Sequence, residues 1–203
     1  MINGGFARGG ISKSSCKRHL KEIYHVGEGD GSPDLPTISF TKEDAAGIIL
    51  GHDNLVVITI ILANANLHRI LVNQGSSADI LFKPAFDKLG LQEKELRAYP
   101  NSLFGLGDTL IQTLRYIPLH TTFEKGSRSR TLSIDYIVVD VSSAYNALIS
   151  RTTLNQLATV ISIPHLCMMF PTPEGIATVK GDQKLARRYY NESLNLKGDP
   201  KGK

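Results

Sequence analysis

The residues best placed to do chemistry form a polar turn, Asn73-Gln74-Gly75-Ser76. An apolar run, Ile70-Leu71-Val72, stops at this turn, and apolar residues restart at Ile80. The polar tip is therefore expected on a tight turn between two buried elements, which is how a fold holds up a catalytic group. Its first residue, Asn73, carries a neutral amide, and an amide cannot accept a proton near neutral pH.

Other titratable residues are expected to be structural. Asp79 lies beyond the turn, where a restarting helix would point it toward solvent or toward the helix N-terminus as a cap. Asp108 is expected to be a turn residue. His68 and His165 have no partner at metal-ligand spacing, so no metal site is predicted.

Serine and cysteine residues indicate no further site. Ser76 and Ser77 lie beside a turn, but no Gly-x-Ser-x-Gly elbow accompanies them, so a serine nucleophile is not predicted. The two cysteines, Cys16 and Cys167, are too few and too far apart for a disulfide framework or a zinc site, which favours free thiols in a reducing compartment.

The elements that must position the turn are visible in the pattern of apolar residues. Two β-rich runs, 54–62 and 67–72, flank an Asn-containing turn and predict a hairpin whose second strand leads to Asn73. The apolar residues from 80 to 89 have helical spacing. Because proline interrupts a helix, we expect a short helix that begins near Pro84 or is broken before it.

Later segments predict more strands, so the expected fold is mainly β with one or two short helices. The segment 103–111 places two glycines and an aspartate between apolar residues, as in a hairpin that can approach a ligand. Residues 144–157 predict a buried strand that passes into a short helix. Strands are also expected in these ranges: 117–123, 131–139, 160–163, 165–170 and 176–179.

The 203 residues suit one domain with polar extensions. Residues 1–35 are rich in Gly, Ser, Lys and Asp and predict a flexible linker. Residues 183–203 form a basic tail, helical or disordered, with six basic and two acidic residues, which accounts for the net charge of +4. Such a tail can make weak contact with nucleic acid, although it is more often simply solvated.

No apolar run approaches the roughly 18 residues of a membrane helix, and the N-terminus lacks the apolar region of a secretory signal. We therefore expect no membrane association and an intracellular location, cytoplasmic or nuclear.

Taken together, several segments resemble the protease region of plant Ty3/gypsy-type retrotransposon polyproteins, a retropepsin-like aspartic protease. The resemblance runs from about Pro36 to Tyr190. It is carried by four segments: Phe40-Thr41-Lys42-Glu43-Asp44-Ala45, Gly75-Ser76-Ser77-Ala78-Asp79-Ile80-Leu81-Phe82, Tyr145-Asn146-Ala147-Leu148-Ile149 and Gly181-Asp182-Gln183-Lys184.

This resemblance implies a closed retropepsin-like (acid protease) β barrel over residues 36–182, preceded by a polyprotein linker over residues 1–35. It also implies a homodimer that cleaves a peptide or polyprotein substrate. Each subunit supplies one carboxylate, and the two share a proton so that one acts as base and the other as acid. No metal or organic cofactor is required.

The resemblance also assigns site residues. Asn73 falls on the position of the catalytic aspartate, Gly75 falls on the turn glycine, and Ser76 follows it. The flap that covers substrate falls on Phe104, Gly105, Leu106, Gly107 and Asp108. The motif that supports the active-site loop falls on Leu148, Ile149, Ser150 and Arg151.

Three positions depart from the family pattern. Asn73 replaces the catalytic aspartate, and in a symmetric dimer both subunits would lack it. Gln74 stands where a serine or threonine hydroxyl is usual. Ser150 replaces a glycine and would be strained if the backbone there needed a positive φ.

The leading hypothesis is a retrotransposon-derived, retropepsin-like domain whose proteolytic activity is impaired because the active-site residue is Asn73. The first alternative is an active aspartic endopeptidase that processes a gag-pol polyprotein. The second is a non-catalytic module that binds peptide or nucleic acid.

Overall fold

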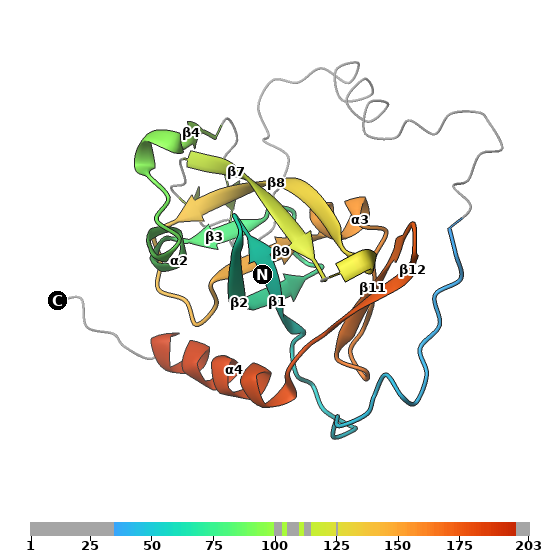
Figure 1. Ribbon diagram of the computed structural model, residues 1–203. Helices are drawn as coiled ribbons and strands as arrows, with labels where there is room; N and C mark the ends of the chain where they lie inside the picture. The colour runs from blue at the N-terminus through green and yellow to red at the C-terminus, as the bar shows by residue number, and fades with distance from the viewer. Residues whose placement is uncertain (1–34, 100–102, 105–109, 112–114, 125, 198–203) are drawn as a thin grey trace, which may run out of the picture.

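The hairpin that leads to the polar turn consists of β1 (Val57–Leu62) and β2 (Ala65–Asn73), which pair antiparallel as the sequence predicts. A computed structural model describes residues 35–99, 103–104, 110–111, 115–124 and 126–197 of the chain (Figure 1). The hairpin reverses at Ala63 and Asn64, whose φ angles of 48° and 68° fit a tight turn. Most of the predicted linker, and also Cys16, lie outside the described residues.

The hairpin belongs to a sheet that closes into a barrel, so the predicted fold class is confirmed. Its strands follow the order β1–β2–β9–β3–β8–β7, and β7 pairs back with β1 through Ile61 and Leu62. Closure removes exposed strand edges. The remaining bounds are β3 (Ile80–Phe82), β4 (Arg97–Ala98), β7 (Arg115–Phe123), β8 (Arg130–Val139) and β9 (Ala147–Ser150).

β9, the last strand of the barrel in the sequence, lies between two early strands, β2 and β3. β2 and β9 run parallel, and so do β3 and β8, whereas β3 and β9 run antiparallel. Residues 80–82, which have helical spacing in the sequence, form β3, because neighbours on both sides complete their backbone hydrogen bonds. The helix begins one residue later.

Short helices connect the strands. α2 (Lys83–Lys88) has Pro84 in its first turn, as predicted, where the missing proline N–H needs no partner. α3 (Arg151–Gln156) follows β9 directly, and two 3₁₀ turns are η1 (Glu93–Glu95) and η2 (Gly126–Arg128). α3 lies at the end of the barrel that carries the polar turn.

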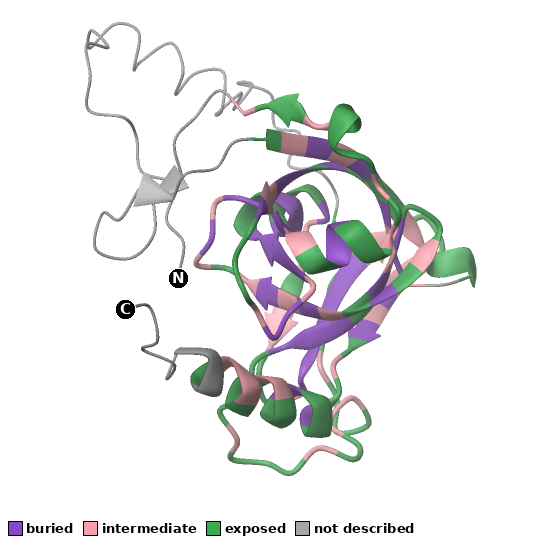
Figure 2. Ribbon diagram, turned by 90° about the vertical axis from the view of Figure 1, so that its left-hand side faces the viewer, coloured by how far each residue is buried: buried purple, intermediate pink, exposed green. Residues whose placement is uncertain are grey.

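The core fills the barrel with aliphatic and aromatic side chains. Ile60 and Ile70 come from the first hairpin, Tyr136 from β8 and Phe86 from α2, and all are almost completely buried. Figure 2 shows the buried residues gathered on the strands, while most residues of α4 are exposed or intermediate. The alternation of inward apolar and outward polar residues along each strand therefore gives the barrel its interior.

Two smaller sheets are separate from the barrel sheet. One consists of β10 (Val160–Ser162), β11 (Cys167–Thr172) and β12 (Gly175–Lys180). The other pairs β5 (Leu103–Phe104) with β6 (Leu110–Ile111).

The basic segment after β12 is a long helix, α4 (Gln183–Lys197), that packs beneath the barrel (Figure 1). Ala186 is buried against Val57 and Tyr145, and the Arg69 guanidinium lies 5.5 Å from the ring centroid of Tyr189. Residues 183–197 are thus not a freely solvated tail, and the residues from 198 onward lie outside the described range.

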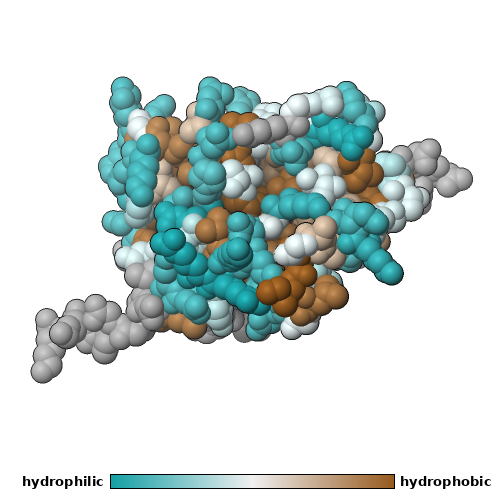
Figure 3. Space-filling model, turned by 60° about the horizontal axis from the view of Figure 1, so that its bottom comes forward, coloured by the Kyte–Doolittle hydropathy of each residue, from teal (hydrophilic) through white to brown (hydrophobic). Residues whose placement is uncertain are grey.

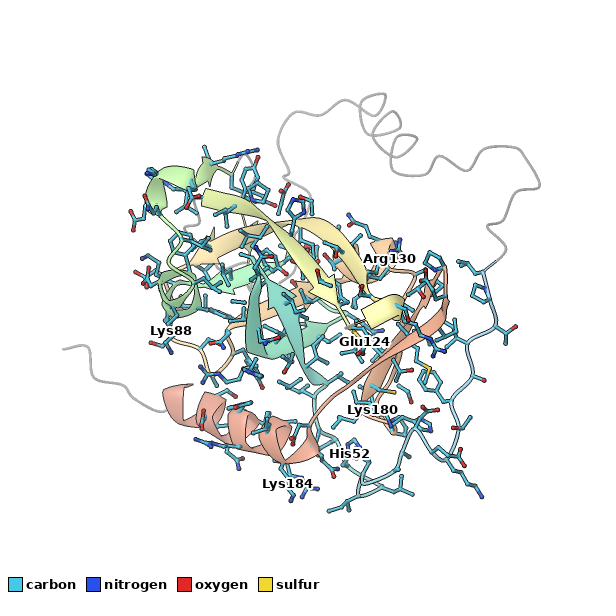
Figure 4. The ribbon with its side chains drawn as sticks, viewed as in Figure 1. His52, Lys88, Glu124, Arg130, Lys180 and Lys184 are labelled. Atoms are coloured by element: carbon cyan, nitrogen blue, oxygen red, sulfur yellow. The ribbon has the colours of Figure 1, made fainter. Side chains whose placement is uncertain are left out.

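The outward face of α4 keeps the basic character of the segment. Figure 4 shows Lys184 pointing away from the barrel, and Figure 3 shows the surface on this side as mostly hydrophilic with separate hydrophobic areas. No helix of the described part of the chain is both long and apolar enough to cross a membrane.

The motif Gly181-Asp182-Gln183 joins α4 to the segment before β1. A Cβ at Gly181 would lie 3.0 Å from the Leu166 carbonyl oxygen, so a side chain there would press on backbone. The Asp182 carboxylate accepts a hydrogen bond from Leu185 N and caps the helix. The buried Gln183 amide accepts from Ile49 N and donates to Ile49 O, each at 3.0 Å.

Replacing Gln183 with methionine is expected to release the segment around Ile49, because both hydrogen bonds are lost while the side-chain volume is kept. We expect a loss of about 1–3 kcal/mol in the free energy of unfolding and faster tryptic cleavage after Lys42. Urea denaturation and timed proteolysis would measure these effects. Lys184→Met, on the exposed face next to it, is the control and should change neither; equal behaviour of the two variants would contradict this role of Gln183.

Candidate functional site

The polar turn begins at Asn73, the last residue of β2. The Asn73 Oδ1 atom accepts a hydrogen bond from Gly75 N at 2.9 Å, and the Asn73 carbonyl accepts from Ser76 N at 3.2 Å. Because the backbone N–H of Gly75 is a donor, the atom that faces it is the amide oxygen, and the NH₂ group of Asn73 remains for other contacts. The side-chain oxygen therefore helps to fold the turn that displays it.

Ser76 lies inside the turn and is completely buried. Its hydroxyl donates to Ala78 O at 2.8 Å and accepts from Ala78 N at 3.3 Å. A hydroxyl engaged in this way shapes the loop.

The end of β9 and the start of α3 support the turn from below. Asn73 lies opposite Ser150 in the parallel register of β2 and β9. Arg151 N donates to Ser76 O at 2.9 Å, and the Arg151 guanidinium approaches Gln74 O at 3.4 Å. Since Thr152 Oγ1 also donates to Ser77 O at 3.1 Å, the helix start holds much of the loop backbone.

The structure thus brings the predicted loop residues and the predicted support residues together. Leu148 and Ile149 are buried, and Ile149 lies opposite Val72, one residue before Asn73. The catalytic and support roles of these residues remain predictions, because adjacency does not establish a reaction.

Ser150 is accommodated without backbone strain. Its φ and ψ are −90° and 170°, which is extended backbone open to any residue, so the strain considered from the sequence does not arise. Its hydroxyl accepts from Thr152 N at 3.2 Å and thereby caps α3. Ser150 is completely buried.

The sequence-based expectation for Asp79, a solvent-facing or helix-capping carboxylate, is wrong. Asp79 immediately precedes β3 and is only 6% exposed. Its carboxylate accepts from Ser150 N at 2.7 Å, from Ser150 Oγ at 2.9 Å and from Thr153 Oγ1 at 2.9 Å. The reason is that the chain restarts as a strand beside β9 and not as a helix.

Burial raises the pKa of the Asp79 carboxyl above its ordinary value. The hydrogen bonds from Ser150 and Thr153 act in the opposite direction, and the neighbouring Asp135 adds repulsion that raises the pKa further. Desolvation is the largest of these effects. Asp79 is therefore a more weakly acidic group than an exposed aspartate.

No linear signal in the sequence connects Asp79 with Ser150, since 71 positions separate them. The hydroxyl residues at 150, 152 and 153 were a partial signal, because serine and threonine at the start of a helix favour capping. Only the pairing of β3 with β9 shows which carboxylate they face.

Part of the predicted flap is described only as backbone. Phe104 lies in β5, where it pairs with Leu110. Gly105, Leu106, Gly107 and Asp108 lie outside the described residues. The flap assignment remains a prediction.

The two histidines considered as metal ligands have ordinary partners. His68 Nδ1 lies 3.0 Å from Thr59 Oγ1, and His165 Nδ1 lies 2.6 Å from Ser162 Oγ while its ring stacks on Phe40. In the part of the chain that the structure describes, no three His, Cys, Asp or Glu side chains gather into a possible metal site.

A polar pocket of about 240 Å³ lies behind the loop, on the side of Asp79. Asp79, Asp135, Ser133 and Gln156 contribute to its lining. Both Asp79 oxygens accept hydrogen bonds from Ser150 and Thr153, at the end of β9 and in α3. At its tip the loop thus presents an amide, which can donate and accept hydrogen bonds but cannot exchange a proton near neutral pH.

Comparison with known proteins gives partial structural matches and no sequence match. No protein-family model matches the chain, and neither does any curated protein. The chain is similar to the retroviral protease-like domain of Ddi1 from Leishmania major, with 12% identity, a TM-score of 0.47, and coverage of 66% of this chain and 98% of that one.

Two further solved structures that the chain resembles in part are proteases. The EIAV protease complexed with the inhibitor HBY-793 has 15% identity, a TM-score of 0.38, and coverage of 57% of this chain and 100% of that one. A retropepsin-like aspartic protease from Rickettsia conorii has 18% identity, a TM-score of 0.37, and coverage of 53% and 76%. Because these likenesses are partial, the function of the chain must be argued from its own residues.

Proposed function

We propose that this chain is a retropepsin-like domain of retrotransposon origin whose proteolytic activity is lost or greatly reduced. One observation carries the proposal: the side chain at the tip of β2, which holds its turn by accepting from Gly75 N, is the amide of Asn73. In the family pattern this position belongs to the carboxylate that activates water.

The chemistry explains why the amide matters. Peptide hydrolysis by this family needs two carboxylates that share one proton, so that one takes a proton from water while the other protonates the substrate. Positioned acid–base catalysis of this kind contributes roughly 10² to 10⁴ in rate. An amide can still orient a water molecule or a peptide carbonyl, but it cannot accept the proton that the attacking water loses.

The alternative of an active endopeptidase needs another carboxylate at the loop tip. Asp79 is the nearest candidate along the loop, and its two oxygens accept from Ser150 and Thr153 behind the turn. Since turning it toward Asn73 would leave three donors unpaired in a buried place, Asp79 does not replace the missing acid.

The partners and location belong to the same proposal. The domain forms a homodimer, retains a site for a peptide or polyprotein segment, and resides in the cytoplasm or nucleus. The proposal also includes weak contact between nucleic acid and the outward face of α4. Lys184 on that face is exposed. Arg188 contributes less net charge, because it pairs with Glu192 at 2.9 Å.

A cleavage assay of the purified chain tests the proposal. Incubation with peptide libraries from acidic to neutral pH should give no cleavage that a statine-type inhibitor suppresses. An Asn73→Ala chain purified in the same way controls for a contaminating protease. Inhibitor-sensitive cleavage by the native chain that disappears in Asn73→Ala would overturn the proposal.

A further inference from the structure

The buried carboxylate behind the loop has a position that suggests a role in the site itself. We propose that Asp79 is a positioning residue: by holding Ser150, it sets the backbone on which residue 73 is displayed. This inference rests on the proposed function, because it concerns the same loop.

The first step is the contact between Asp79 and the end of β9. The antiparallel pairing of β3 with β9 extends from Leu81 opposite Ala147 to Ile80 opposite Leu148. Beyond that point a side chain replaces the backbone of β3 as hydrogen-bond acceptor: Asp79 Oδ1 accepts from Ser150 N at 2.7 Å. The carboxylate thus gives β9 a hydrogen-bond acceptor two residues beyond Leu148.

The second step leads from Ser150 to the loop. Ser150 lies opposite Asn73 in the parallel register of β2 and β9. The next residue, Arg151, donates its backbone N–H to Ser76 O at 2.9 Å. A shift of Ser150 would therefore move both the strand that carries residue 73 and the helix start that holds the turn.

The third step is the use of a carboxylate in a buried place. An apolar side chain of similar size would fill the space without a desolvation cost, but it would leave the N–H of Ser150 and two hydroxyls without this acceptor. Two oxygens that accept from three donors fix direction as well as distance. This is what a loop needs if its tip must be held in one orientation.

Hydrogen exchange of backbone amides in the native chain tests this role without any assay of activity. We expect Asp79→Ala to lower the protection of the Ser76 and Arg151 amides about ten-fold or more beyond any change at the amides of β11 and β12. Asp79→Asn, which keeps one acceptor for Ser150 N, should recover most of the protection. The control Asp135→Ala removes the other carboxylate of the pocket and should leave the loop amides unchanged.

Two results would overturn the inference. One is an equal loss of protection at the loop and in β11 and β12, which would make Asp79 a contributor to global stability only. The other is unchanged protection at Ser76 and Arg151. If Asp79→Ala does not fold, Asp79→Asn decides, because its amide keeps an acceptor for Ser150 N but loses the second carboxylate oxygen. A small loss of protection confined to the loop amides supports positioning, whereas an equal loss in β11 and β12, or no loss at all, refutes it.

A second measurement uses the Asn73→Asp chain and separates this inference from the proposed function. In that chain Asp79→Asn should lower kcat for peptide cleavage more than it raises KM, because it disturbs the orientation of the carboxylate introduced at position 73 and leaves substrate binding largely intact. A chain with Asn73→Asp that cleaves no peptide would count against the Asn73 amide as the cause of inactivity, while the exchange measurement would still decide the role of Asp79.

Discussion

Asn73→Asp is expected to give the chain inhibitor-sensitive peptidase activity at least about 100-fold above that of the native chain, with an optimum on the acidic side of neutrality. The substitution exchanges an NH₂ group for an oxygen and keeps the shape of the side chain. Gly75 N already donates to the oxygen of residue 73, and it would donate to a carboxylate in the same way. A rate of peptide cleavage measured against pH, with and without a statine-type inhibitor, checks this result.

The matched variant is Asn73→Asp combined with Ser150→Gly, which restores two of the three positions that depart from the family pattern. Because Ser150 has extended backbone angles and a fully bonded hydroxyl, the added change should bring no further gain in kcat/KM. A large additional gain would show that Ser150 is a second defect. No cleavage by either variant, in a chain shown by sedimentation to be folded and dimeric, would mean that the amide at residue 73 is not the cause of inactivity.

Much of the fold follows from patterns that the sequence carries locally. The β-branched runs on both sides of Ala63 and Asn64 predict the first hairpin, and Pro84 marks where the helix after β3 begins. Strands at regular spacing predict the barrel. These features depend on periodicity and turn residues within a few positions of one another, so they can be recognised without knowing the tertiary structure.

The features that needed the structure all join residues far apart in the chain. Asp79 meets Ser150 because β3 runs beside β9, and Gln183 binds Ile49 because α4 packs beneath the barrel. In both cases a polar side chain is buried because its partner is a distant backbone group. Local rules predict such residues to be exposed, since burial of a polar group is costly unless a partner is present.

The assignment of the loop tip was accessible from the sequence for a different reason. The polar turn after Val72 is a local pattern, and its contact with the segment ending at Arg151 was inferred from a family resemblance. Two details come only from the structure. One is that the side-chain oxygen of Asn73 faces Gly75 N, and the other is that the backbone of Ser150 is extended.

Acid should stabilise the native chain relative to the Asp79→Asn variant. Burial raises the pKa of Asp79 above its ordinary value of 3.8, and Asp135 adds to the effect. Between the unfolded and folded pKa values the folded chain holds a proton that the unfolded chain releases, so stability falls as the pH rises through this window. The slope is at most about 1.4 kcal/mol per pH unit, and asparagine, which does not titrate, removes it.

Urea denaturation of both chains at several values from pH 4 to pH 7 measures this linkage. The two chains share all other titrating groups, so the contributions of these groups cancel in the difference between the free energies of unfolding of the native chain and Asp79→Asn. The control Asp135→Asn should reduce the slope, because it removes the repulsion that helps to raise the pKa of Asp79. A difference that grows in favour of the native chain toward neutral pH would instead mean that the donors from Ser150 and Thr153 outweigh desolvation. In that case the carboxylate would hold the loop most strongly when it is charged.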